Sequence, residues 1–158
     1  MWEYNDKQIT SSELFPEDTI GFIYCIYNIT KDKKYIGKKN IGAWKVVSEK
    51  NYNESKEKGL TVARHKNKSQ SVKGEPVWVY KVRAESNWVK YCGSNAELQE
   101  DIKNGDKIKK VILFTANCTK QLTFLEMETQ IKMDVLRSPK EYYNQNILGK
   151  FWPNDLNC

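Results

Sequence analysis

Hydrophobic and polar positions mark three strand-like stretches of the chain, each bounded by turn-forming residues. Residues 20–29 read IGFIYCIYNI, residues 34–41 read KYIGKKNI, and residues 107–116 read KIKKVILFTA. Runs rich in β-branched and aromatic residues are typical of strands. The short polar connection between the first two predicts an antiparallel hairpin. The pattern therefore predicts three core strands.

Two further stretches carry helix start and stop signals. Residues 95–105 begin at Asn95, a good cap, and end at Gly105. Residues 119–139 form the longest predicted helix, which begins at Thr119 and stops before a proline. The resulting order predicts an α/β fold: a three-stranded, mainly antiparallel sheet flanked by helices.

The remaining segments set the expected organisation. Residues 1–19 are expected to form an N-terminal arm, residues 20–146 one domain, and residues 147–158 a C-terminal tail. Residues 40–84 form a long basic insertion after the second strand. Its first part, up to residue 76, is polar without a clean period and predicts little regular structure before a strand at 77–82. A loop this long in a compact domain is usually functional or disordered.

Composition narrows the class of protein. The chain has 158 residues, about the size of one domain, and no apolar run near the ~18 residues of a membrane helix. Its polar, acidic N-terminus is unlike a signal peptide, so we expect a cytoplasmic protein without membrane contact. The four cysteines include no CxxC pair and there is one histidine. Reduced thiols are expected, and a structural zinc site is not.

Charge is concentrated in the middle of the chain. The formal net charge is +6, and residues 31–90 hold sixteen Lys or Arg against six acids. The first 20 residues, by contrast, hold five acids and one lysine. A basic region interleaved with Trp and Tyr suits a polyanion such as nucleic acid. A solvated lysine surface is the alternative interpretation.

The predicted hairpin gathers polar side chains on one face. A two- or four-residue turn around Lys31-Asp32 places Tyr24 opposite Lys39, Ile26 opposite Gly37 and Asn28 opposite Tyr35. Because side chains alternate along a strand, one face then carries Tyr24, Tyr35, Gly37 and Lys39. The other face carries Ile23, Cys25 and Ile36, directed toward a core. The tyrosines could equally be half-buried strand aromatics whose hydroxyls reach solvent.

These residues resemble a known family. GFIY at 21–24, followed after ten residues by YIG at 35–37, resembles the signature of the GIY-YIG nuclease superfamily. Three later blocks, at 85–98, 124–136 and 141–144, are similar to those of phage-encoded members related to Seg-type homing endonucleases. The first pair is moderately specific, whereas four blocks in order are a strong match.

The resemblance implies a metal-dependent DNA endonuclease that hydrolyses phosphodiester bonds, of homing type and phage-related. It implies that Tyr24 and Tyr35 are catalytic, with Tyr24 as general base directly or through water. Asn144 falls on a late family asparagine. A helix glutamate would hold Mg²⁺ or Mn²⁺, which prefer oxygen ligands. The implied partner is double-stranded DNA, in the host cytoplasm, with a homodimer or accessory protein for specificity.

Two glutamates on the 119–139 helix compete for the metal. Glu126 and Glu128 lie about 200° apart around a helix. Each borders an apolar stripe, so periodicity does not choose between them. The stripes are Leu122, Leu125, Met133 and Leu136, and Phe124, Met127, Ile131 and Val135. The resemblance, through Leu-Glu at 125–126, favours Glu126 as the catalytic metal ligand; an apolar residue three positions later would favour Glu128.

The chain departs from the family at one cation. Many members carry a catalytic arginine soon after the YIG strand, whereas this chain has no arginine before Arg64. Lys39 is the expected catalytic substitute, with Lys45, Arg64 and Arg83 as alternatives; a lysine lacks the guanidinium fork. The residues expected to bind nucleic acid are Lys38, Lys45, Arg64, Lys66 and Arg83.

Two other functions fit the same residues. The first is a catalytically weak or inactive nucleic-acid-binding module, which retention of both tyrosines, Gly37 and a helix glutamate argues against. The second is a structure-specific or RNA-directed nuclease, which the catalytic residues do not exclude.

Overall fold

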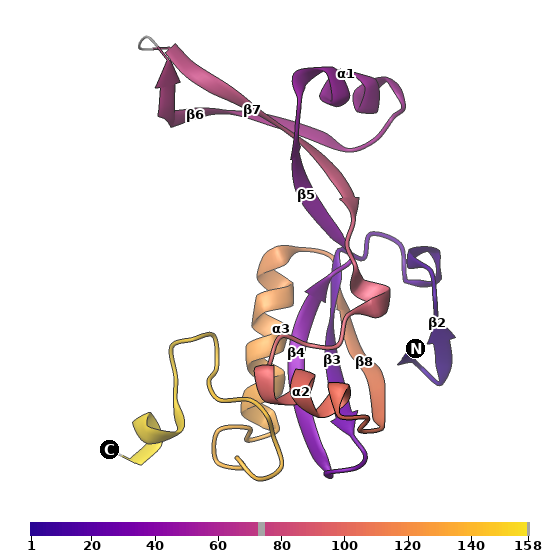
Figure 1. Cartoon of the computed structure of the whole chain (residues 1–158), viewed down its shortest axis with the longest axis vertical. Helices are drawn as coiled ribbons and strands as arrows, with labels where there is room; N and C mark the ends of the chain where they lie inside the picture. Colours follow the sequence, from indigo (N-terminus) through magenta and orange to yellow (C-terminus); the bar gives the residue numbers. More distant parts are fainter. Residues whose placement is uncertain (73–74, 158) are drawn as a thin grey trace. The chain divides into compact units, whose positions relative to one another are not determined.

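The computed structural model of the protein describes residues 1–72 and 75–157. The chain forms two compact units. Unit 1 comprises Met1–Ile41 and Asn87–Cys158, and unit 2 comprises Gly42–Ser86. Each unit has its own β-sheet (Figure 1).

Unit 1 is built on a five-stranded sheet with the order β2-β1-β8-β3-β4. Strand β1 runs parallel to β8, and the other neighbours are antiparallel. Its strands are β1 (Trp2–Tyr4), β2 (Lys7–Ile9), β3 (Gly21–Asn28), β4 (Lys33–Asn40) and β8 (Ile108–Ala116). Its helices are α2 (Ala96–Lys103), α3 (Thr119–Lys132) and the 3₁₀ turns η1 (Ser12–Leu14), η2 (Trp88–Lys90) and η3 (Pro153–Asn157). The mixed α/β class is therefore as expected.

The expected three-stranded sheet was wrong, because the N-terminal segment adds two strands. Trp2 is fully buried, and its indole Nε1 donates to the carbonyl of Trp88 at 2.8 Å. Its strand pairs with β8, with Trp2 beside Lys110. Three-residue strands are too short to show alternation in the sequence. Their place is set by partners far along the chain.

The two faces of this sheet support separate cores. On one face Phe22, Tyr24 and Ile26 pack with residues of the N-terminal segment, η2 and α2. On the other face Ile23 and Ile36 pack with Leu122 of α3 and with the segment that follows it. Sheet strands that are covered on both sides become continuous apolar runs. This explains why residues 20–29 contain few polar positions.

The β3–β4 hairpin differs from the predicted register by two residues. Tyr24 pairs with Gly37, Ile26 with Tyr35 and Asn28 with Lys33. The connection is a four-residue turn in which the Asn28 carboxamide oxygen accepts from the N–H groups of Thr30 and Lys31. A shift of two keeps every side chain on its face. The expected shared face of Tyr24, Tyr35, Gly37 and Lys39 therefore survives the wrong pairing.

Helix α3 is shorter than predicted. It ends at Lys132, before the expected stop at Pro139. Asp134 has a positive φ of 52°, a left-handed conformation that ends an α-helix. Val135 and Leu136 are still buried, so the chain turns back onto the sheet there.

Unit 2 is a three-stranded antiparallel sheet of order β5-β7-β6. Its elements are β5 (Gly42–Val47), α1 (Glu49–Glu57), β6 (Val62–Val72) and β7 (Glu75–Glu85). The prediction of little regular structure across 40–76 was therefore wrong. Polar and basic residues occupy eight of the eleven positions of β6, so its alternation is hidden in the sequence. Helix α1 rests on one face through the rings of Tyr52 and Tyr80, whose centroids are 5.1 Å apart.

The expectations about free thiols and membrane helices can be compared with the described part of the chain. Cys25, Cys92 and Cys118 are free thiols there. In the same residues, no helix is both long and apolar enough to cross a membrane.

Candidate active site

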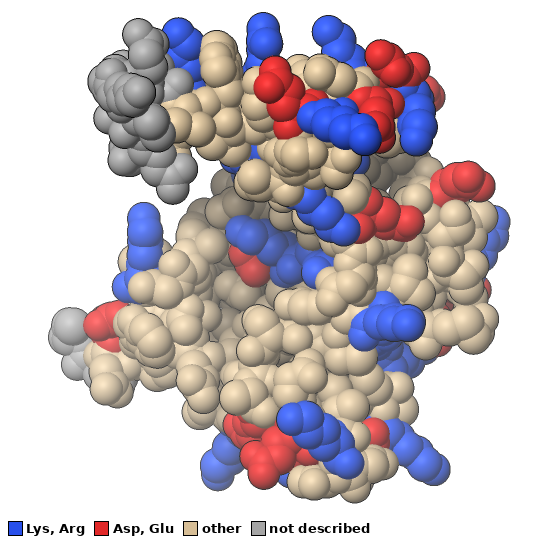
Figure 2. Space-filling view, turned by 45° about the horizontal axis from the view of Figure 1, so that its top comes forward, with Lys and Arg blue, Asp and Glu red and all other residues tan. Residues whose placement is uncertain are grey.

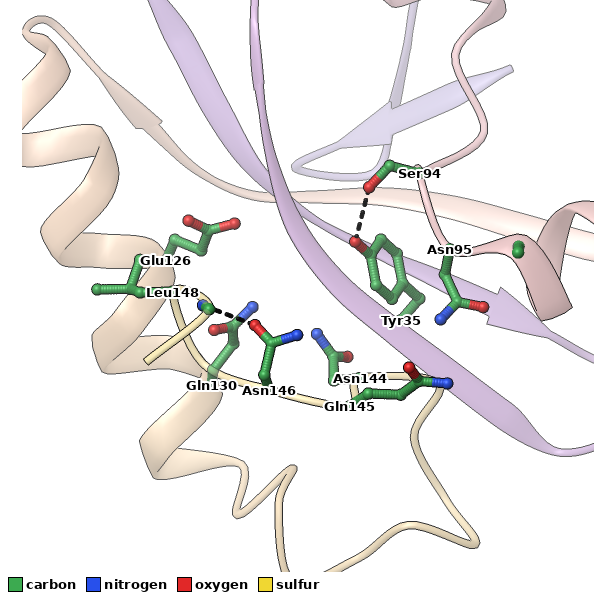
Figure 3. Close-up of a pocket in the computed structure, with 11 residues that line it drawn as sticks. Tyr35, Ser94, Asn95, Glu126, Gln130, Asn144, Gln145, Asn146 and Leu148 are labelled. Atoms are coloured by element: carbon green, nitrogen blue, oxygen red, sulfur yellow. Dashed lines mark hydrogen bonds between the residues drawn. The ribbon is translucent and has the colours of Figure 1, made fainter. Parts of the chain in front are cut away.

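A polar pocket of about 420 Å³ lies in unit 1 (Figure 3). Its lining comes from strand β4, the start of α2, helix α3 and the segment after Asn144. Tyr35 and Glu126, two of the predicted catalytic residues, both line it. Five carboxamides also line it: Asn95, Gln130, Asn144, Gln145 and Asn146. The fold thus joins the YIG strand and the glutamate helix in one site.

Tyr35 presents its phenol to this pocket. Its hydroxyl forms a hydrogen bond with Ser94 Oγ at 3.1 Å (Figure 3). Burial raises the pKa of Tyr35, although the Ser94 hydrogen bond opposes the shift. The phenol is therefore protonated at neutral pH and available as a hydrogen-bonding group.

Tyr24 lies deeper, on the same face of the sheet. It is 1% exposed, and the rings of Tyr24 and Tyr35 are 6.1 Å apart. Gly37 makes room for it, because a Cβ on Gly37 would lie 2.5 Å from the Tyr24 hydroxyl. Burial, with smaller effects from Tyr35 and Tyr91, raises the pKa of Tyr24 well above its usual range. The glycine of the YIG motif thus has a steric reason: only glycine fits beside this phenol.

The structure separates the two competing glutamates. The Glu126 carboxylate lines the pocket, and its side chain is 15% exposed. Glu128 pairs instead with Lys132 at 2.9 Å along the helix surface. The reason is the packing of α3, which buries Leu122 and leaves Phe124 and Ile131 exposed. Glu126 borders the buried stripe, and Glu128 borders the exposed one.

Two lysines flank the site from opposite faces of β4. Lys38 Nζ is 3.0 Å from Glu126 Oε2 and donates to Thr123 Oγ1, also at 3.0 Å. Lys39 donates to Asn87 Oδ1 at 2.8 Å and lies 4.2 Å from the centre of the Tyr91 ring. Burial lowers the pKa of Lys39. Lys38, expected only as a nucleic-acid contact, is thus the cation that touches the glutamate.

Asn144 holds strand β4 in place. Its Oδ1 accepts from Ile36 N–H at 3.0 Å, and its Nδ2 donates to Ile36 O at 2.8 Å. Both bonds are buried. The side chain thus behaves as an extra strand residue at the edge of the sheet. It fixes the backbone between Tyr35 and Gly37.

Gln130 is a pocket residue that the sequence predictions missed. It follows Glu126 by four positions on α3, and residues at this spacing share a helix face. Its Nε2 donates to Ile36 O at 3.1 Å, the same carbonyl that Asn144 uses. The i,i+4 spacing from Glu126 was the available sequence signal.

The pocket's donor set fits a hard divalent cation. No group of three His, Cys, Asp or Glu side chains that could hold a metal occurs among the described residues. Glu126 is the carboxylate of the pocket, five carboxamide side chains line the same pocket, and Gln130 Oε1 is buried without a hydrogen-bond partner among the described residues. Mg²⁺ binds through one or two carboxylates and keeps several waters. Such a site needs only this small set of oxygens.

The other predicted nucleic-acid contacts lie in unit 2, on both faces of its sheet. The strand register puts Lys45, Arg64 and Lys66 on the face of Trp78, and Arg83 on the opposite face. Trp78 is 40% exposed, with Arg64 and Lys66 4.9 Å and 5.2 Å from its ring. An exposed indole between cations is a suitable platform for a nucleotide base.

Basic charge is unevenly divided along the chain. Unit 2 holds ten Lys or Arg against five Glu, whereas the rest of the chain holds sixteen against fifteen acids. Figure 2 shows Lys and Arg spread over the visible face with Asp and Glu between them. Unit 2 therefore carries nearly all of the chain's positive excess.

Comparison with known proteins agrees with the motif. Residues 2–147 match the family model described as "Putative endonuclease segE, GIY-YIG domain". No curated protein and no solved structure matches the chain. The match includes both tyrosines, Gly37, Glu126 and Asn144, and it extends through all of unit 2. The chain therefore belongs to the GIY-YIG family of Seg-type endonuclease domains.

Proposed function

We propose that the protein is a metal-dependent DNA endonuclease that hydrolyses phosphodiester bonds. The observation that carries the proposal is the pocket itself. It unites the phenol of Tyr35 with the carboxylate of Glu126, although these residues come from separate blocks of the motif. Membership of an endonuclease-domain family supports the same conclusion.

Glu126 would hold the cation, which we propose to be Mg²⁺ or Mn²⁺. When bound, it supplies positive charge that offsets the charge developing on the scissile phosphate and the leaving oxygen. Lys38 pairs with Glu126 in the protein alone, at 3.0 Å. Lys38 would exchange that carboxylate for a phosphate oxygen.

Tyr35 would orient the attacking water. Its hydroxyl lines the pocket and is held by Ser94 at 3.1 Å. Tyr24 was expected to be the base, but its burial and raised pKa oppose ionisation at neutral pH. We therefore assign the contact with the water to Tyr35 and a positioning role to Tyr24. Asn144 would keep Tyr35 in place through the backbone of β4.

Unit 2 would bind the DNA backbone. Its ten basic residues supply phosphate contacts, and Trp78 supplies a stacking surface. The resemblance of the motif blocks to phage-encoded Seg-type homing endonucleases extends the proposal to a homing-type, phage-related enzyme that acts in the host cytoplasm.

The test is a plasmid-cutting assay with Glu126→Ala and Glu128→Ala side by side. The wild type should nick or cut plasmid DNA with Mg²⁺ and not with EDTA. Glu126→Ala should lower the rate by about 10²-fold or more, since a preorganised charge in the site is lost. Glu128→Ala should stay within about twofold, because its partner is a surface lysine.

Two outcomes would overturn this assignment. Metal-dependent cutting that persists in Glu126→Ala would show that the pocket takes no part in the reaction. DNA binding without cutting, at any divalent metal, would leave a binding module. Branched DNA and RNA assayed in parallel identify a structure-specific or RNA-directed nuclease by a higher rate than on plasmid.

A further inference from the structure

The side-chain carboxamide of Gln130 forms a hydrogen bond through only one of its two polar atoms. Its side chain is 96% buried, since only 4% of the residue is exposed. The amide nitrogen Nε2 donates to Ile36 O at 3.1 Å. The oxygen Oε1 has no hydrogen-bond partner among the described residues. A buried acceptor without a partner costs about 1–3 kcal/mol.

The orientation of this carboxamide is dictated by its surroundings. Ile36 O is an acceptor, and it already receives Asn144 Nδ2 at 2.8 Å. A flipped Gln130 would place its oxygen against that carbonyl, acceptor facing acceptor. The nitrogen must therefore face β4, which turns the oxygen of this pocket-lining residue away from that carbonyl.

The unused oxygen shares its environment with Glu126. The two residues are four apart on α3, so they emerge from the same helix face. Both line the 420 Å³ pocket. A role limited to joining α3 to β4 would use the nitrogen alone. It would not require an acceptor in the pocket.

We propose that Gln130 Oε1 is the second oxygen donor of the divalent-cation site at Glu126. This rests on the proposed function, because Glu126 is the anchoring carboxylate there. A carboxamide oxygen is an accepted ligand of hard cations. It adds a donor without adding charge, so a single carboxylate remains the only anion. The cation in turn satisfies the buried oxygen.

The first experiment measures Mn²⁺ binding to the full chain without DNA, by water-proton relaxation. Gln130→Met keeps similar bulk but has no oxygen, and it should weaken Mn²⁺ binding about tenfold. Gln130→Glu puts a carboxylate oxygen at the same position and should tighten binding about tenfold. Far-UV circular dichroism checks that each variant is folded.

Gln145→Glu is the matched control for Gln130→Glu. It makes the same Gln-to-Glu change in the same pocket. Its side chain, however, is exposed and lies on the segment after Asn144, outside helix α3. Binding should change less than threefold. Equal tightening in both variants would mean that general charge, and not the Gln130 oxygen, acts on the ion.

A second measurement needs no variant. In the wild type, Mg²⁺ should shift the side-chain carbonyl carbon of Gln130 in the NMR spectrum, and it should leave that of Asn144 unchanged. Failure of the two proposals is distinguishable. Only this inference is overturned if Mn²⁺ binding depends on Glu126 but not on Gln130 and the Gln130 carbon does not shift. Absent binding, or binding unchanged in Glu126→Gln, overturns the metal site as a whole.

Discussion

The two units of this chain differ in how their sequences produce a surface. Unit 1 is almost balanced in charge and gathers its polar groups from separate segments into one pocket. Unit 2 holds the positive excess and displays it along neighbouring strands of a small sheet. The pocket of unit 1 thus depends on distant contacts, whereas the basic surface of unit 2 follows from alternation along neighbouring strands.

This difference also separates the consequences of substitution. A change in the pocket of unit 1 should alter the rate of reaction at saturating DNA. A change on the sheet of unit 2 should alter the affinity and its dependence on salt. Five predictions test this division; the first has the largest expected effect and the last the smallest.

The largest effect should come from the pocket phenol. Tyr35→Phe removes the hydroxyl that faces the pocket, and kcat for plasmid cutting should fall about 10²-fold or more. DNA affinity should be unchanged. Tyr24→Phe, at a buried position of the same face, should cost less. A larger loss in Tyr24→Phe would return the catalytic contact to Tyr24.

The counterpart in unit 2 is Trp78→Ala, measured in the same assay and by fluorescence anisotropy. It should weaken DNA binding about tenfold, within the usual contribution of one stacked base. Its kcat at saturating DNA should match the wild type. A changed kcat there, or a changed affinity in Tyr35→Phe, would break the division between the units.

Removal of unit 2 is the next largest change. Gly42 and Glu85 are paired across β5 and β7, so an Asn-Gly turn can replace residues 43–84. The shortened chain should still unfold cooperatively in urea, because the cores of unit 1 lie outside this range. DNA affinity should fall about tenfold to 100-fold at 0.15 M salt. Unchanged affinity would place the DNA contacts on unit 1.

Replacing one glycine in each unit by alanine compares how well the two units tolerate an added methyl group. Gly37→Ala would bring a methyl group to 2.5 Å from the Tyr24 hydroxyl, and should lower the free energy of unfolding by about 1–3 kcal/mol. Gly42→Ala in unit 2 meets Arg83 Nε at 2.7 Å. That side chain can move, so the cost should be under about 1 kcal/mol. Urea denaturation measures both, and equal costs would contradict the packing argument.

The smallest effect concerns one cation. Lys66→Gln, beside Trp78, should reduce the slope of log affinity against log salt by about 0.9, the loss of one phosphate contact. Lys132→Gln in unit 1 removes a charge that already pairs with Glu128. Its slope should equal that of the wild type. Titrations at several salt concentrations give both slopes.

Much of unit 1 could be predicted because its signals are local. Strand alternation put Tyr24 and Tyr35 on one face even though the register was wrong, since a slip of two preserves faces. The Asn95 cap located α2. Helix α3 begins at Thr119 as expected, but its N-cap is Cys118 and not Thr119. The motif blocks then supplied the family, which the match over residues 2–147 confirmed.

The features that could not be predicted from the sequence depend on tertiary contacts. The choice between Glu126 and Glu128 required knowing which stripe of α3 is buried. Strand β1 is fixed by β8 and by the burial of Trp2, which no local pattern reveals. In unit 2, polar residues on exposed strands concealed the alternation. The functional roles of all these side chains remain predictions.

The segment after α3 has a consequence for solubility. Strand β4 is the last strand of its sheet, and an uncovered edge invites pairing with another chain. Tyr142 forms a bridge with Lys34, and the Asn144 side chain bonds both backbone groups of Ile36. The segment therefore shields the edge from self-association. The strand that carries Tyr35 is thereby kept from pairing with the same strand of a second copy.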